Sequence, residues 1–344
     1  MQASDAILGW TGTYVVDGSE SHFESEMKTP RSANAPVKLL PRLTQILTTY
    51  ERDPTILASL AIKLLRPVPF TQILTLASEE SLIHALQSPA PSANVLAITV
   101  IQKASRSPGE TAILSVMKGV VENFLRTWLS TPHVEVGEKA TLALGELLEV
   151  DFDRRSAATL STQMNGMEID SNKPSGQGLL WRRIFRDKEI YELLFSLCSP
   201  ETTGNDPGQL DERQKSLAQA RLLRILPKLA ALDFDLLTHS CFPDVEEQYL
   251  EGQERSLLYF ATTEMIDKED LLMHVTLFDF FAEFLGAMSV SDLTQSKMDY
   301  LAALLQKVTL SDTALYNYLE ALATNTETPP ELIDLLVRLN QYQG

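Results

Sequence analysis

Residues 144–153 read LGELLEVDFD and residues 226–235 read LPKLAALDFD. The two stretches share two leucines and the tripeptide DFD at a constant offset of 82 residues. Two repeats of about 41 residues would produce this offset, and that length falls within the range of HEAT and armadillo units. The sequence therefore predicts a chain built from helical repeats.

Other parts of the chain support the same interpretation. Apolar residues recur every three or four positions in NVLAITVIQKAS (94–105), VMKGVVENFLRTWL (116–129) and HVTLFDFFAEFLGAM (274–288), with breaks at Pro and Gly, and strict two-residue alternation over a usable length is absent. One type of helix follows one type of turn three times: LAIKLL at Leu60, LAITVI at Leu96 and LALGEL at Leu142, each preceded within about ten residues by Pro54, Pro91 or Pro132. We predict an all-α fold, specifically a HEAT/armadillo-like α-solenoid of stacked helical hairpins. Such stacking leaves one long curved surface free, which suits the binding of another protein.

The chain divides by composition into a leader and one long repeat region. Residues 1–36 are poor in periodic apolar residues and end in KTPRSANAP, so we expect a flexible leader. Residues 37–344 are expected to form a single solenoid. Small and polar residues dominate 153–178, which predicts a long inserted loop, and GNDPG (204–208) marks a shorter one.

The net charge of -17 is concentrated in the last third of the chain. Residues 1–177 contain 15 basic and 19 acidic residues, residues 178–228 contain 9 and 7, and residues 229–344 contain 5 and 20. The net charges of these three parts are -4, +2 and -15. Because nucleic-acid affinity depends on Lys and Arg displacing condensed counterions, this charge disfavours nucleic acid as a primary partner.

The two cysteines and the sequence near Met1 indicate where the protein works. Cys198 and Cys241 form no CxxC pattern, so neither a disulfide framework nor a zinc site is expected. No run of 18 or more apolar residues is present, and the first residues lack the basic start and apolar middle of a signal peptide. We expect a soluble, reduced, intracellular protein without membrane contact, located in the cytoplasm, with the nucleus left open as a second location.

Catalytic and metal-binding patterns are weak throughout the sequence. The five histidines show no pair four residues apart, and HSC at residues 239–241 lacks the surroundings of a catalytic cysteine, which favours a packed thiol. The two DFD tripeptides could bind Mg²⁺, but they are better explained as helix caps, because each follows a predicted helix. Phosphate loops, nucleotide fingerprints and GxSxG or HExxH motifs are missing. We expect no enzymatic activity, cofactor, metal or small-molecule substrate.

Two surfaces are candidates for binding a protein partner. The first is the acidic last third, where Asp244, Glu246, Glu247 and Glu251 form either a solvated face or an acidic cradle for a basic partner. The second is GLLWRRIFRDKEIY (178–191). On a helix, Leu180, Trp181, Ile184 and Phe185 would share a core-facing side, and Asp187 could cap the next helix, whose Ile190, Leu193, Leu194 and Leu197 continue the core. The remaining basic residues, Arg182, Arg183 and Arg186, either pair with this protein's own carboxylates or face a partner.

The stretch GLLWRRIFRDKEIYELLFSLCSP (178–200), which follows a low-complexity loop in a HEAT-like chain, resembles the assembly-chaperone family of the proteasome regulatory particle. Fungal members of that family carry the historical label of a DNA mismatch repair protein. The resemblance implies a non-enzymatic solenoid that binds the C-terminal domain of an ATPase subunit of the regulatory-particle base and escorts it until the ring assembles. The alternatives are a DNA mismatch repair accessory factor that uses residues 178–228 on nucleic acid, and a generic HEAT-repeat scaffold or transport adaptor.

Overall fold

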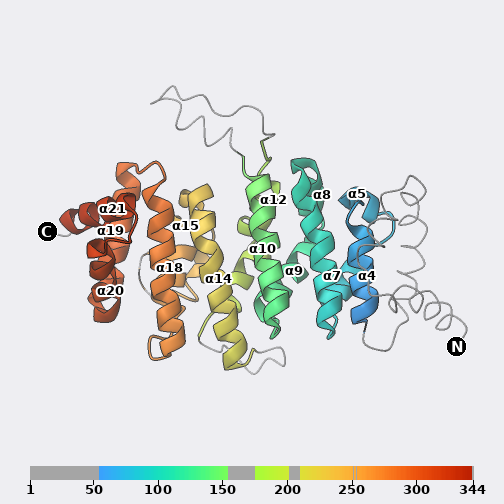
Figure 1. Cartoon of the computed structure of the whole chain (residues 1–344), viewed down its shortest axis with the longest axis horizontal. Coiled ribbons are helices and arrows are strands. Elements are labelled where there is room, and N and C mark those ends of the chain that lie inside the picture. The colour runs from blue at the N-terminus through green and yellow to red at the C-terminus, as the bar shows by residue number, and fades with distance from the viewer. Residues whose placement is uncertain (1–53, 154–174, 201–209, 251, 253, 343–344) are drawn as a thin grey trace, which may run out of the picture. The chain divides into compact units, whose positions relative to one another are not determined.

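A computed structural model of the chain describes residues 54–153, 175–200, 210–250, 252 and 254–342. These residues form helices, turns and connecting segments, and no strand occurs among them, so the predicted all-α class is confirmed (Figure 1). The chain divides into two compact units, Met1–Ala77 and Ser78–Gly344. This boundary lies inside the predicted solenoid of residues 37–344, whose unity stays a prediction. The leader at residues 1–36 lies outside the described residues.

The first unit contains two described helices, α4 (Thr55–Leu65) and α5 (Phe70–Ile73). Pro54 occupies the N-cap position of α4, as the sequence predicts, and the LAIKLL motif lies within that helix. Leu57, Ala61 and Leu64 are buried at the spacing of one helix face.

The second unit begins at α6 and ends near the C-terminus. Its helices are α6 (Glu79–Leu86), α7 (Pro91–Gln102), the 3-10 helix η1 (Lys103–Arg106), α8 (Pro108–Val116), α9 (Lys118–Ser130), α10 (Val134–Asp151), α12 (Leu179–Phe185), α13 (Lys188–Ser196), α14 (Glu212–Leu232), α15 (Phe234–Thr238), α16 (Pro243–Glu246), α17 (Leu257–Thr263), α18 (Leu271–Ser289), α19 (Gln295–Leu310), α20 (Thr313–Thr324) and α21 (Pro330–Tyr342).

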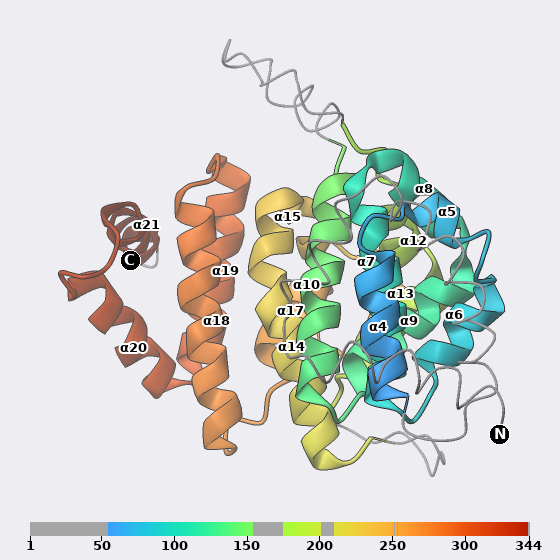
Figure 2. The ribbon, with the colours of Figure 1, turned by 45° about the vertical axis from the view of Figure 1, so that its right-hand side comes forward.

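The long helices of the second unit pack in chain order. Helix α7 packs on α10, α10 on α14, α14 on α18, and α18 on α21, while α6 packs on α9 and α9 on α14. Figures 1 and 2 both show α10, α14 and α18 side by side. Each helix therefore buries its apolar face against the next, which is the arrangement expected of stacked repeats. The assignment to the HEAT or armadillo type stays a prediction.

The two DFD motifs are helix caps, as predicted. Asp233 ends α14 and accepts a hydrogen bond of 3.0 Å from the backbone N–H of Leu236, in the first turn of α15. Its counterpart Asp151, at the end of α10, is fully buried and accepts bonds of 2.7 and 3.1 Å from the N–H groups of Leu180 and Trp181. It thus caps α12, a helix that begins 28 residues later (179 − 151 = 28). Both copies of the motif thus place an Asp at the start of a helix, although the predicted loop of residues 153–178 separates Asp151 from α12.

The two ends of that predicted loop meet at Asp151. The backbone N–H of Gly178 donates to the carbonyl of Asp151 at 2.8 Å, and that of Gly176 donates to Phe152 at 3.1 Å. Gly176 lies so close that a Cβ atom there would overlap the backbone of Asp151. Gly178 has φ 64°, a left-handed conformation that favours glycine. Residues 154–174, and the second predicted loop at 204–208, lie outside the described residues.

Prolines open several helices but do not always end one. Pro91, Pro108 and Pro243 each occupy a first-turn position, where the missing N–H costs nothing. Pro227, in contrast, lies inside α14, so the expectation that prolines break the helical segments is wrong at this position. Pro227 is buried, and α14 packs on both α10 and α18. These contacts keep the helix continuous despite the lost hydrogen bond.

A buried arginine joins three of the long helices. Arg221 on α14 is 5% exposed, and its guanidinium donates to the carbonyls of Trp128 and Leu129, at 2.9 and 3.1 Å, in the last turn of α9. A cation at a helix C-terminus is favoured by the helix dipole. Gly137 on α10 provides the space, because a Cβ atom there would overlap the guanidinium.

Helix α18 is long and apolar enough to cross a membrane by length and composition alone. Within the second unit, one side of the helix is buried: Phe280, Phe281, Phe284 and Leu285 pack inward and the helix contacts α14, α20 and α21, although only 39% of its apolar window is buried. The core helix of a globular protein passes the same length test, so this feature gives little support to a membrane span.

Candidate functional site

The segment 178–191 forms α12, the start of α13 and the turn between them, and its apolar half belongs to the core as predicted. Leu180, Trp181, Ile184 and Phe185 are all buried. Trp181 stacks on Phe185 with ring centroids 5.4 Å apart, and its indole N–H donates to the carbonyl of Leu148 at 2.8 Å. A buried indole needs such an acceptor, and this bond fixes α12 against the end of α10.

The central arginine of the segment joins α12 to α8. Arg183 donates from Nε to the backbone carbonyl of Ser115 at 2.8 Å, near the end of α8, and from Nη1 to Asp187 Oδ2 at 2.9 Å. Both ion-pair partners are largely shielded, with side-chain exposures of 29% and 16%. Of the two roles considered for this arginine, the structure therefore supports the internal one.

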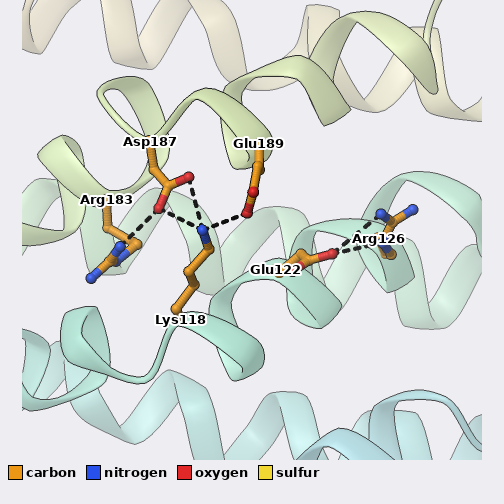
Figure 3. Close-up of polar contacts among 6 residues, drawn as sticks. All are labelled: Lys118, Glu122, Arg126, Arg183, Asp187 and Glu189. Atoms are coloured by element: carbon orange, nitrogen blue, oxygen red, sulfur yellow. Dashed lines mark hydrogen bonds and ion pairs between the residues drawn. The ribbon is translucent and has the colours of Figure 1, made fainter.

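Asp187 occupies the N-cap position of α13, but its side chain makes no capping hydrogen bond there, in contrast to the prediction. Figure 3 shows its carboxylate between Arg183 and Lys118. Lys118, at the start of α9, lies 3.1 Å from Asp187 and 2.6 Å from Glu189. These four side chains form what we call the α9–α13 ion cluster. The Asp187 carboxylate accepts hydrogen bonds from two cations, because such charge-assisted bonds are stronger than a capping bond from a backbone N–H of α13.

Electrostatics within the ion cluster favour the charged form of Asp187. Burial alone would raise the pKa of Asp187, but hydrogen bonds from Lys118 and Arg183 outweigh it and lower the pKa below its ordinary value of 3.8. The pKa of Lys118 is raised, first by its hydrogen bond to Glu189 and then by that to Asp187. The cluster therefore stabilises the fold at neutral pH.

The other two arginines of the segment remain accessible. Arg182 is exposed and donates to the backbone carbonyls of Gln177 and Gly178, at 2.8 and 3.2 Å, where the inserted loop ends. Arg186 is exposed as well, and its charge acts on Asp233 and on Cys241. A role in partner binding remains a prediction for both.

Two of the predicted acidic residues are exposed and paired with cations. Asp244 forms an ion pair with Lys188 of α13, and the two side chains are 64% and 50% exposed. Glu247 is 62% exposed and lies 2.6 Å from Arg255. Surface pairs of this kind contribute little to stability and leave both carboxylates accessible to a partner. Glu251 lies outside the described residues.

The prediction for Glu246 is wrong, because this residue does not lie on an exposed acidic face. Its side chain is fully buried and accepts hydrogen bonds from the Tyr191 hydroxyl at 2.8 Å and the Cys241 backbone N–H at 2.9 Å, and from the Ser240 hydroxyl. Burial, with the neighbouring Glu246 charge, raises the pKa of Tyr191, so this phenol stays protonated and donates. Glu246 holds α13 against α16. The run of acidic residues in the sequence did not indicate that one of them is buried.

The two cysteines are unsuited to nucleophilic catalysis. Cys198 is fully buried, and burial raises the pKa of its thiol well above the ordinary range. Burial also raises the pKa of Cys241, whose Sγ is 3.9 Å from the carbonyl of Leu236. His239 bonds from its ring to the carbonyl of Asp235 at 2.9 Å rather than to the thiol. Within the described ranges, no group of three His, Cys, Asp or Glu side chains converges as metal ligands would.

Sequence reasoning did not find Lys118, which completes the ion cluster. Lys118 lies 69 residues before Asp187 (187 − 118 = 69), so no local pattern connects them. One local feature could have indicated its role: Lys118 lies at the start of a predicted helix, where the helix dipole disfavours positive charge. A cation at that position suggests that carboxylates lie nearby.

The ion cluster predicts unequal effects for two arginines in Figure 3. We expect Arg183→Ala to lower the free energy of unfolding by about 1.5 kcal/mol, because it removes two largely shielded hydrogen bonds of a charged group. Among the residues that the structure describes, Arg126 pairs only with Glu122, one turn away on the surface of α9, so Arg126→Ala should cost less than about 0.5 kcal/mol. Urea unfolding of both variants measures the difference.

The same pair of variants has a pH dependence with a defined sign. Because the pKa of Asp187 is lowered in the folded protein, its ionised carboxylate contributes to the free energy of unfolding above pH 3.8. This contribution is lost as the pH falls below 3.8. The effect of Arg183→Ala should therefore shrink below pH 3.8, leaving the part due to Ser115. An Arg126→Ala variant as unstable as Arg183→Ala at pH 7 would contradict the assignment.

Comparison with known protein families finds a match in the first half of the chain. Residues 19–148 match the family described as "DNA mismatch repair protein HSM3, N terminal domain". Of these residues, 54–148 are described and comprise the helices from α4 through most of α10. A comparison with curated proteins finds no match. Residues 19–148 are thus similar to the N-terminal domain of the HSM3 family, whose description carries the same mismatch repair label as the family that residues 178–200 resemble.

Proposed function

We propose that this protein is a non-enzymatic chaperone or adaptor that binds the C-terminal domain of a proteasome regulatory-particle ATPase subunit and assists assembly of the base. The observation that carries the proposal is the HSM3 N-terminal domain match, together with the independent resemblance at residues 178–200. The all-α architecture supports it, because helices that pack in chain order are typical of repeat proteins, which bind folded protein clients.

Affinity in this proposal comes from a few buried anchors, and the acidic surface governs the rate of encounter. Residues 229–344 carry 5 basic and 20 acidic residues, which would attract a basic client over long distance. Exposed Asp244 and Glu247 can contribute to this field, whereas buried Glu246 holds the fold. The protein acts by binding and release, and the expectation that it has no enzymatic activity is part of the proposal.

The direct test uses the purified chain and the C-terminal domain of each regulatory-particle ATPase subunit in turn. We expect one of these domains to bind, with an association rate that falls with added salt. The double variant Asp244→Asn, Glu247→Gln should bind more slowly at low salt with little change in dissociation rate. If none of the domains binds at micromolar concentration, the proposed client is wrong.

A role on DNA is the second candidate, because the family description itself names mismatch repair. This function needs basic side chains in one exposed stripe. Arg183 is turned inward and Lys188 is paired with Asp244, so two of the four cations between residues 182 and 188 are engaged within the protein. A gel shift with duplex and single-stranded DNA at low salt separates the candidates, since a complex at micromolar protein would favour the DNA role.

A further inference from the structure

Helix α18 has one face that packs within the protein and one that does not. On the inner side, His274 contacts Asp312 at the start of α20 with 2.6 Å between Nε2 and Oδ2, and Phe278 stacks on Tyr318 at 5.1 Å. Phe281 and Phe284 are fully buried. These contacts fix the rotation of α18 about its axis, so its opposite face is held outward.

The opposite face runs the whole length of the helix. Its members recur at spacings of three and four residues, which places them on one side of a helix. We call this set the α18 stripe: Leu272, Val275, Asp279, Glu283, Gly286 and Val290. The two ends of the stripe are about 27 Å apart at the standard rise per residue. In Figures 1 and 2, α18 lies beside α14.

The α18 stripe is apolar at its ends and acidic at its centre. Leu272, Val275 and Val290 are 73%, 44% and 76% exposed. Leu272 and Val275 lie one turn apart on this face, and neighbouring exposed apolar side chains of this kind suit burial by another protein. A Cβ atom at Gly286 would meet nothing within 4 Å, so a partner backbone can approach closely there.

The two carboxylates at the centre of the stripe have not been neutralised by the neighbouring helix. Two cations of α14 pair with α10 and not with α18: Arg224 with Glu138, and Lys228 with Glu149 at 3.0 Å. Asp279 and Glu283 are exposed and form no ion pair within the part of the chain that the structure describes. Two adjacent acidic groups, one helical turn apart, therefore face solvent between apolar ends.

We propose that the α18 stripe is the docking surface for an amphipathic helix of the protein partner that carries two cations one turn apart between apolar ends. Lys or Arg at that spacing would pair with Asp279 and Glu283. Apolar residues of the partner would cover Leu272 and Val275 at one end and Val290 at the other, in the manner of a helix laid into a surface by evenly spaced anchors. This inference rests on the proposed function only in taking the partner to be a folded protein with a basic helix.

A synthetic helix tests the stripe without knowledge of the client. The probe is a fluorescent peptide of about 19 residues, with leucines at both ends of one face and two arginines four residues apart at its centre. A second peptide replaces the arginines with glutamates. The test variant is Asp279→Lys, Glu283→Lys in the full chain. The matched control is Glu264→Lys, Glu327→Lys, which makes the same change in net charge at exposed positions outside the stripe.

We expect the full chain to bind the arginine peptide, the test variant to bind it at least tenfold more weakly, and the control to stay within twofold. The test variant should also prefer the glutamate peptide. The variant Leu272→Ala, Val290→Ala should weaken binding without changing charge. Equal weakening by the test and control variants would show attraction by net charge alone and would overturn the proposal, as would no binding by the unmodified chain.

Parallel purification from cells separates failure of the stripe from failure of the proposed function. Loss of ATPase subunits from the test variant, but not from the control, supports the stripe. If both variants retain the subunits, the stripe is wrong and the function stands. If the unmodified chain recovers no ATPase subunit while peptide binding still follows the stripe, the proposed function is wrong and the stripe stands.

Discussion

Gly137→Ala is expected to lower the free energy of unfolding by about 3 kcal/mol, although alanine is the better helix former. The added methyl group would overlap the guanidinium of Arg221. Arg221 must then leave its position, which deprives the carbonyls of Trp128 and Leu129 of their donor and leaves a buried charge without partners. Thermal and urea unfolding, followed by the helical circular dichroism signal, measure this loss.

Gly145 on the same helix is the matched control. A Cβ atom there would meet only the flexible end of Lys228, with 3.4 Å to its Nζ atom. Gly145→Ala should therefore leave stability unchanged or raise it by less than about 1 kcal/mol through helix propensity. In a double-mutant cycle, Arg221→Leu should remove most of the extra cost of Gly137→Ala. Additive effects of the two substitutions would contradict the steric explanation.

Asp151→Ala is the second substitution with a large expected effect. It removes a buried acceptor from two backbone N–H groups, those of Leu180 and Trp181, and should cost about 2–3 kcal/mol. Asp233→Ala at the equivalent repeat position removes a single bond to a half-buried residue and should cost about 1 kcal/mol. Near-equal losses for the two caps would show that burial of the cap is not the cause.

Asp151→Asn separates the hydrogen bonds from the charge. Oδ1 of Asp151 has no hydrogen-bond partner among the described residues, so an amide nitrogen can replace it while the remaining oxygen caps α12. Burial raises the pKa of Asp151 against the opposing effect of its backbone hydrogen bonds. A carboxyl whose pKa is raised in the fold favours folding at low pH and loses that contribution as the pH rises. Relative to the unmodified chain, Asp151→Asn should therefore gain stability as the pH rises above 3.8.

The helices and their caps could be predicted from sequence because both depend on local patterns. The DFD repeat gave the positions of Asp151 and Asp233, and the prolines at residues 54, 91 and 132 marked the starts of α4, α7 and α10. Pro227 was the exception, since its tolerance inside α14 depends on packing against other helices. The sequence also predicted the buried side of α12, which the spacing of Trp181 and Phe185 determines.

The side-chain roles were harder to predict, because they depend on contacts between distant residues. Glu246 and Glu247 are neighbours in one acidic run, yet one is buried against Tyr191 and the other is exposed. Which side of a short helix faces inward is set by the partner helix, and α16 is only a single turn. Likewise, Arg183 could be placed on the polar side of α12, but its acceptor at Ser115 lies 68 residues away.

The central claim is that this protein binds a regulatory-particle ATPase subunit during assembly. Affinity purification of the tagged full chain from its own cells at moderate salt, with mass spectrometry of the proteins that co-purify, tests it most directly. The account predicts recovery of one or more regulatory-particle ATPase subunits without the mature core particle. Recovery of mismatch-repair or replication proteins in their place would contradict it and would direct the next experiments to DNA.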